Sequence, residues 1–227
     1  MKMCLDLQGV LRRVGMTANF LFAVALCYPY SVRLAAGEVI DSAISENQGV
    51  YQLHLDMILD APFKNVHHVI TDYRHIYRIN PSIVESEILP TKDKSTTRVR
   101  TLINDCVLFF CQDLLRVEDV HELGYNDIYS VIVPQLSNVR SGNTRWQIRP
   151  MGDKTRIIYD MTLEPGFFVP PVIGSYIVRN KLREQALISF NNIERIALIQ
   201  KKLDKAHNSA PNGALPMSTT SRHNHAN

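Results

Sequence analysis

Clusters of basic residues are missing from this 227-residue chain, and its formal net charge is only +3. No block of lysine and arginine interrupts the sequence. Proteins that bind nucleic acid through its phosphates carry such clusters on one face or along one helix. We therefore do not expect this chain to bind nucleic acid.

Catalytic motifs are missing as well. The chain has no Gly-x-Ser-x-Gly elbow, no His-Glu-x-x-His, no glycine-rich phosphate loop and no Cys-x-x-Cys. The stretch 173–176 (Ile-Gly-Ser-Tyr) is typical of a helix start rather than of a nucleophile turn. His67 and His68 are adjacent in a short helix and so point in different directions, which argues against a shared metal. We expect no metal and no cofactor, and a non-catalytic role is favoured over an enzymatic one.

The N-terminal 36 residues do not have the pattern of a folded domain. Arg12 and Arg13 precede a mostly apolar run at 14–27, and residues 34–36 (Leu-Ala-Ala) offer a small-residue cleavage site before Gly37. This layout predicts a secretory signal over residues 1–36 and export to the periplasm. An uncleaved membrane anchor is the alternative, because the apolar stretch is nearly long enough to span a bilayer.

The C-terminal residues are also expected to lie outside the fold. From His207 onward the chain is polar and has no apolar periodicity, so it cannot bury enough surface to offset its chain entropy. Residues 206–227 are predicted to form a disordered polar tail. His223 and His225 in this tail are interpreted as solvated rather than as metal ligands.

Between these ends, residues 45–205 read as one continuous domain. Residues 51–59 alternate apolar and polar side chains with a period of two, which predicts a half-buried strand. Two short helices are expected at 61–70 and 72–79, the second ended by Asn80-Pro81. Six strands are then expected at 83–89, 97–106, 111–121, 128–133, 144–149 and 155–163, with turns at 91–94, 123–124, 141–143 and 151–153.

A long helix follows the last strand. Pro170 and Pro171 suit its first turn, and no proline interrupts the sequence from there to Lys205. Its apolar residues recur at steps of three or four, on one face: Val178, Leu182, Ala186, Phe190, Ile193 and Ala197. A meander of strands followed by one amphipathic helix predicts an α+β fold, with an antiparallel sheet curved around the helix.

Three segments resemble a known superfamily. They are the strand end at 58–62 (Ile-Leu-Asp-Ala-Pro), the stretch from Val69 through Asn80-Pro81 to Ile83, and the turn at 163–171 (Leu-Glu-Pro-Gly-Phe-Phe-Val-Pro-Pro). Over Tyr51 to Leu203 the chain resembles the START-like, or polyketide cyclase/dehydrase and lipid transport (SRPBCC), superfamily. It is most similar to exported proteobacterial members, with coenzyme Q-binding proteins as more distant relatives.

The resemblance implies a helix-grip fold, in which a curved antiparallel sheet of about seven strands holds the C-terminal helix around a cavity for an apolar ligand. It does not fix the function. Lipid carriers, cyclases, hormone receptors and ribosome-associated factors share this scaffold.

A cavity between a curved sheet and one helix is expected to be apolar with a few orienting polar groups. The alternative is that the same residues pack a solid core. The candidate lining residues are Leu55, Met57, Tyr73, Tyr77, Val99, Tyr129, Trp146, Tyr159, Met161, Val178, Leu182, Ala186 and Phe190.

A cyclase-type enzyme would need a polar acid or base inside this cavity. Five arginines, at 98, 100, 116, 145 and 149, mostly alternate with apolar residues, as solvent-facing strand positions do. The polar residues whose positions allow a catalytic role are Tyr73, His75, Tyr77, Arg100, Tyr129, Arg145 and Asp160, although rim or surface placement is the alternative for each.

Two apolar loops are candidates for the cavity mouth or for a lip that touches a membrane. Their residues are Leu108, Phe109, Phe110, Phe167, Phe168 and Val169. Cys106 and Cys111 flank the first loop, so a hairpin there would place them opposite each other and allow a disulfide in an oxidising compartment. Packed, reduced cysteines are the alternative.

Together these features predict a monomer that binds, and transports, a hydrophobic small molecule or lipid in an internal cavity, with transient membrane contact. A cyclase- or aromatase-like enzyme that uses the same cavity is the first alternative. An adaptor that binds a protein partner through its sheet is the second.

Overall fold

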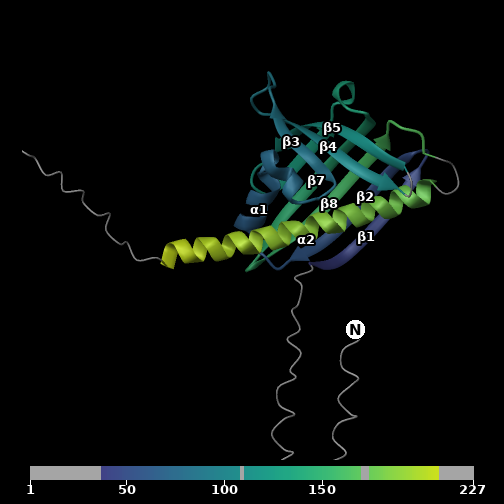
Figure 1. Cartoon of the computed structure of the whole chain (residues 1–227). Coiled ribbons are helices and arrows are strands. Elements are labelled where there is room, and N and C mark those ends of the chain that lie inside the picture. The colour runs from purple at the N-terminus through teal and green to yellow at the C-terminus, as the bar shows by residue number, and fades with distance from the viewer. Residues whose placement is uncertain (1–36, 108–109, 170–173, 210–227) are drawn as a thin grey trace, which may run out of the picture. The chain divides into compact units, whose positions relative to one another are not determined.

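The structure is a computed structural model that describes residues 37–107, 110–169 and 174–209 (Figure 1). Every described element belongs to one compact unit. These elements are β1 (Glu38–Asn47), β2 (Val50–Leu59), α1 (Phe63–Thr71), the 3-10 helix η1 (Tyr73–Arg78), β3 (Ile83–Leu89), β4 (Thr97–Val107), β5 (Phe110–Glu122), β6 (Asp127–Ile132), the 3-10 turn η2 (Pro134–Leu136), β7 (Val139–Met151), β8 (Lys154–Pro165) and α2 (Gly174–Ser209).

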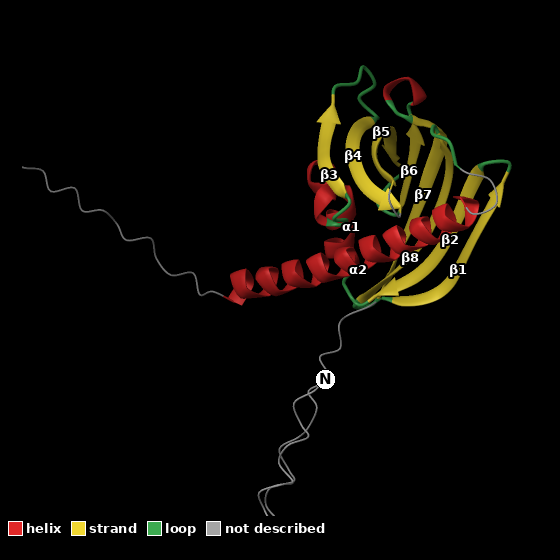
Figure 2. Cartoon of the chain, turned by 45° about the vertical axis from the view of Figure 1, so that its right-hand side comes forward, coloured by secondary structure: helices red, strands yellow, loops and turns green. Residues whose placement is uncertain are grey.

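The strands form one antiparallel sheet in the order β1-β2-β8-β7-β6-β5-β4-β3. The sheet curves without closing, and α2 crosses in front of it (Figure 2). Strands β3 to β8 follow each other as a meander, and β2 joins the far side of β8. The predicted α+β helix-grip architecture is therefore confirmed.

The sheet has one strand more than the seven expected. β1 begins at Glu38, ahead of residue 45 where the sequence placed the start of the domain, and it pairs along its length with β2. The sequence concealed this strand because β1 is an edge strand that is exposed or half-buried at every position. Ile44 is its residue that packs against the core, so the apolar alternation that marks a buried face is absent.

The predicted turn at 141–143 is wrong, because these residues lie inside β7. Gly142 is paired with Leu163 of β8, and the link from β6 to β7 is made by η2 instead. A Cβ atom at Gly142 would lie 2.8 Å from the carbonyl oxygen of Thr162 and 3.1 Å from the side chain of Ile132. This glycine therefore permits close packing rather than a reversal of the chain.

The second predicted helix is a 3-10 helix, η1, whose backbone is broken at His75. Asn80 follows it and ties it to α2, because its Nδ2 donates to the carbonyl oxygen of Gln185 (3.1 Å) and to Oγ of Ser189 (3.0 Å). Asn192 on the next turn of α2 donates to the carbonyl oxygen of Ile79 (3.1 Å). The middle of α2 is thus fixed to the link between η1 and β3.

The apolar stripe predicted for the long helix is the face that α2 buries. Phe190, Ile193 and Ala197 are fully buried in the core, and Leu182 and Ala186 pack against it. The predicted helix start at Pro170 and Pro171 lies outside the described residues, and the described helix extends to Ser209. In the part of the chain that the structure describes, no helix combines the length and the apolar character needed to cross a bilayer.

Candidate functional site

Alternate residues of three adjacent strands point toward α2. Tyr159 of β8 lies in register between Leu55 of β2 and Trp146 of β7, and register partners share one face of a sheet. Most of the predicted lining residues meet in one core beneath the helix. Buried there are Leu55, Met57, Tyr73, Val99, Tyr159, Met161 and Phe190, with Trp146, Leu182 and Ala186 packed against them and Val178 half-buried.

Three aromatic rings fill the space between the sheet and α2. The ring centroid of Trp146 lies 4.5 Å from that of Tyr159 and 5.5 Å from that of Phe190, and Tyr159 and Phe190 are 5.7 Å apart. These separations are those of favourable tilted and edge-to-face aromatic pairs. The rings therefore pack against one another at the centre of the predicted cavity.

Two predicted lining residues are wrong. Tyr129 is 36% exposed because its neighbours Ile128 and Ser130 point inward, which puts Tyr129 on the outer face of β6. Tyr77 is 44% exposed and its ring packs edge-on against His75 on the surface of η1.

The polar residues considered for catalysis do not gather in the core. Arg145 and Asp160 are mostly exposed on the outer face, where Asp160 pairs with His54 (2.6 Å), and Arg100 is bound by Glu85 and Glu87. Tyr73 is buried, but its hydroxyl donates to Glu122 (2.9 Å), and burial raises its pKa. This set therefore forms no shared acid–base site.

A different polar cluster lies on the inner face of the sheet, formed by Arg116, Glu118, Ser130 and Thr144. Nε of Arg116 lies 3.0 Å from Oε2 of Glu118, and Oγ of Ser130 donates to Oε1 of the same carboxylate (3.0 Å). Ser130 also shares a hydrogen bond of 2.6 Å with Thr144. All but Arg116 are buried, and Arg116 is half-buried. We call these four residues the inner polar cluster.

The register places this cluster beside the aromatic rings. Glu118 lies opposite Val99, and Thr144 lies opposite Met161, both of which are core residues. Burial raises the pKa of the Tyr159 phenol, Arg116 lowers it and Glu118 raises it, so Tyr159 is within electrostatic reach of both charges. The sequence interpretation had placed Arg116 toward solvent, which is wrong.

Arg116 keeps donors available. A guanidinium has five N–H groups, and Glu118 is its one charged partner within the described residues. Although Nε is close to Glu118, it is buried without a hydrogen bond of good geometry. A half-buried cation with unused donors, set in an apolar surface, is suited to hold one acceptor group of an otherwise apolar molecule.

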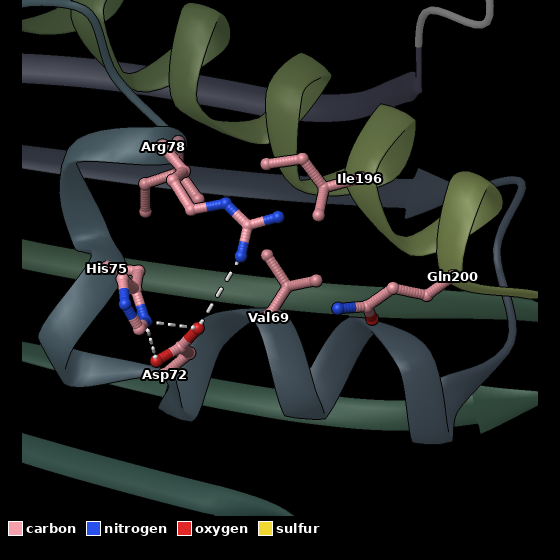
Figure 3. Close-up of a pocket in the computed structure, with 7 residues that line it drawn as sticks. Val69, Asp72, His75, Arg78, Ile196 and Gln200 are labelled. Atoms are coloured by element: carbon pink, nitrogen blue, oxygen red, sulfur yellow. Dashed lines mark hydrogen bonds and ion pairs between the residues drawn. The ribbon is translucent and has the colours of Figure 1, made fainter. Parts of the chain in front are cut away.

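Two hollows on the described surface can be compared with the expected cavity, and neither matches it. One, of about 10 Å³, lies between α1, η1 and α2, where Asp72 pairs with His75 (2.7 Å) and Arg78 (3.7 Å); Val69 and Gln200 also line it (Figure 3). It has room for about one water molecule. The other, of about 320 Å³, is an open groove on the outer side of β1, β2 and β8, beside His54 and Asp160.

The predicted mouth is only partly within the described structure. Leu108 and Phe109 lie outside the described residues, as does the side chain of Phe110. Phe168 is 81% exposed and Tyr176 in the first turns of α2 is also exposed, whereas Phe167 and Val169 are half-buried. One exposed aromatic residue therefore follows β8, and another lies in the first turn of α2.

The β4–β5 hairpin has the predicted register. Cys106 lies directly opposite Cys111, and Cys106 is disulfide-bonded. These two facts support a Cys106–Cys111 bridge, which stays a prediction. Within the described residues, no group of three or more histidine, cysteine, aspartate or glutamate side chains is placed to bind a metal.

Comparison with known proteins supports the fold and leaves the activity open. No protein-family model and no curated protein sequence matches the chain. The fold is similar to that of a START superfamily protein from Mycobacterium smegmatis, with a TM-score of 0.52 and 18% identity over 64% of this chain and 98% of that one.

Two further solved structures share the architecture. The ZhuI aromatase/cyclase from Streptomyces sp. R1128 has a TM-score of 0.55 at 13% identity, covering 69% of this chain and 98% of its own. Human STARD10 has a TM-score of 0.54 at 12% identity, covering 73% and 76%. The chain therefore has the helix-grip fold of these START-type structures.

Proposed function

We propose that the chain binds a hydrophobic small molecule or lipid between the inner face of its sheet and α2. The observation that supports this most is the inner polar cluster, since a buried ion pair adds little to stability and is costly to place in an apolar core. A bound ligand that accepts hydrogen bonds from Arg116 would explain why a charged group is placed there. The START-type neighbours, one of them an aromatase/cyclase, make a ligand-binding role for this face more plausible.

The ligand has two parts in this proposal. Its polar end, an acceptor such as a hydroxyl, carbonyl or acidic oxygen, accepts hydrogen bonds from Arg116. Its apolar body takes the place now filled by Trp146, Tyr159 and Phe190. Because these rings pack closely, binding requires them to rotate or α2 to shift.

Transport, membrane contact and compartment belong to the same proposal. Phe168 and Tyr176 are exposed beside the start of α2, where weak membrane contact would let a ligand pass without crossing water. The N-terminal 36 residues are proposed to direct a monomer to the periplasm. We also propose that the chain is related most nearly to exported proteobacterial members of the START-like superfamily. Coenzyme Q-binding proteins would be more distant relatives.

Native mass spectrometry of delipidated protein, incubated with a mixed lipid extract, tests the binding role. The proposal expects uptake of intact lipid at one copy per chain. A product that differs in mass from the bound molecule would favour the cyclase-like alternative. Absence of any uptake would refute both.

A further inference from the structure

Glu194 of α2 has a fully buried carboxyl group, and it is not part of the inner polar cluster. It is 0% exposed and lies between the core residues Ile193 and Ala197 and the end of β2. Its Oε1 accepts the backbone N–H of Asp60 (2.9 Å), while Oε2 is buried without a hydrogen bond to any described residue. Burying a carboxylate without a cationic partner is costly.

The charged groups around Glu194 do not neutralise the negative charge of its carboxylate. Burial raises its pKa most, the Asp60 carboxylate raises it further, and the Asp60 N–H and the Lys154 ammonium lower it. Lys154 is bound to Asp60 (2.6 Å), so its charge is already shared with another carboxylate. Among the described residues, Glu194 therefore lacks a cation of its own.

The backbone nitrogen of Gly37 faces this carboxyl group. The Gly37 N–H lowers the pKa of Glu194, and Gly37 packs against Ile58 and Leu59, directly before the Asp60 N–H that binds Oε1. A Cβ atom at Gly37 would lie 2.7 Å from Cδ2 of Leu59 and 3.2 Å from the carbonyl oxygen of Ile58. A larger residue would crowd Leu59 and Ile58, so glycine favours the close packing that places this nitrogen near Glu194.

The sequence also predicts signal-peptide cleavage directly before Gly37. Residues 34–36 (Leu-Ala-Ala) offer a small-residue cleavage site before it, and the described structure begins at Gly37. Hydrolysis of the Ala36–Gly37 bond by a processing peptidase would add water, leave a carboxylate on Ala36 and free the amine of Gly37. At neutral pH that amine takes a proton and carries a full positive charge.

We propose that processing after Ala36 creates an α-ammonium group on Gly37 that forms a buried ion pair with Glu194. The proposal rests on the predicted signal, and ligand binding can fail without affecting it. The ammonium replaces one neutral N–H by three donors and a charge, so it can satisfy Oε2. The pair would fasten the start of edge strand β1 to α2, and cleavage would thereby complete the fold.

The test uses the full chain expressed in a host that exports it. Intact mass should show that the mature protein begins at Gly37. Carbamylation of its α-amine, which removes the charge, should lower the melting temperature by about 4 °C or more at pH 6. That loss should vanish in Glu194→Gln and persist in Glu184→Gln, which changes an exposed glutamate on the same helix.

A pH series gives a second readout that does not depend on the variants. Pairing raises the pKa of the amine in the folded state, so its stabilisation is present below the ordinary value of about 8 and is lost as pH rises through the raised value. NMR titration of the ¹⁵N-labelled Gly37 amine measures this directly. Another N-terminus, an unchanged melting temperature on carbamylation, or an amine that titrates in its ordinary range would overturn the proposal.

Discussion

Nε of Arg116 lies 3.0 Å from Oε2 of Glu118, on the face of the sheet that carries the core. Charged residues are rarely buried in an apolar core, and those that are buried are paired. Arg116 and Glu118 are such a pair, at successive inward positions of β5. The pair supports the proposed ligand binding, and its removal should change the free energy of unfolding.

Replacing Arg116 alone should be much worse than replacing the pair. Arg116→Met leaves Glu118 buried without its cation and should cost about 3 kcal/mol in the free energy of unfolding. Arg116→Met with Glu118→Leu removes both charges and should return to within about 1 kcal/mol of the wild type. Denaturant unfolding at pH 7 measures both. Equal stability of the single variant and the wild type would mean that solvent screens the pair.

The bidentate pair of Asp56 and Arg156 should contribute to acid sensitivity. Arg156 donates to both carboxylate oxygens (2.9 and 2.6 Å), and this lowers the pKa of Asp56 below its usual 3.8. The stabilisation is therefore present above pH 3.8 and is lost as pH falls through the lowered pKa. Asp56→Asn should cost a modest amount at pH 6, since Arg156 is 44% exposed, and progressively less in acid.

Asp153→Asn is the matched control for this acid limb, because its side chain is 94% exposed and lies 3.8 Å from Lys201. Its unfolding free energy should follow that of the wild type from pH 3 to 7. If Asp56→Asn does the same, the pair contributes nothing measurable to stability.

The exposed aromatic residue just after β8, Phe168, should mediate membrane contact. Phe168→Ser should reduce sedimentation of the protein with liposomes and slow lipid transfer between them, with little change in melting temperature, because Phe168 is 81% exposed. Tyr125→Ser is the control, since Tyr125 is equally exposed (80%) in the link from β5 to β6, at the opposite end of the sheet. An equal loss in both variants would indicate nonspecific adsorption.

The β4–β5 hairpin should be closed by a disulfide. Cys106 is disulfide-bonded and lies opposite Cys111, whereas the other two cysteines, Cys4 and Cys27, fall within the predicted signal. Thiol titration of the unfolded mature protein without reductant should find no free thiol. Two free thiols would exclude the Cys106–Cys111 bridge.

The sequence predicted the strands well where one face of the strand is buried and the other is exposed to solvent. Residues 51–59 alternate clearly, and they form β2 as expected. β1 failed this rule because its exposed edge position leaves no apolar face to detect. The residues at 141–143 failed it for another reason, since turn chemistry and close strand packing both select glycine.

The candidate site was harder to predict because a period of two separates the faces of a strand without saying which one is inside. In β5, Val117 is buried on the outer face beneath the segment around η2, where its N–H donates to Ser137 (2.9 Å). Val120 is buried on the inner face of the same strand, beside Glu118. With apolar residues on both faces, the inward direction of Arg116 could not be read from the pattern.

The central claim is that a ligand binds between the sheet and α2, and Trp146 offers a direct test. It is the single tryptophan of the chain, and its ring lies 4.5 Å from Tyr159 and 5.5 Å from Phe190. Titration of the delipidated protein with a brominated fatty acid should quench Trp146 fluorescence saturably, at one ligand per chain by native mass spectrometry. Binding at that stoichiometry without quenching would place the ligand elsewhere and contradict the account.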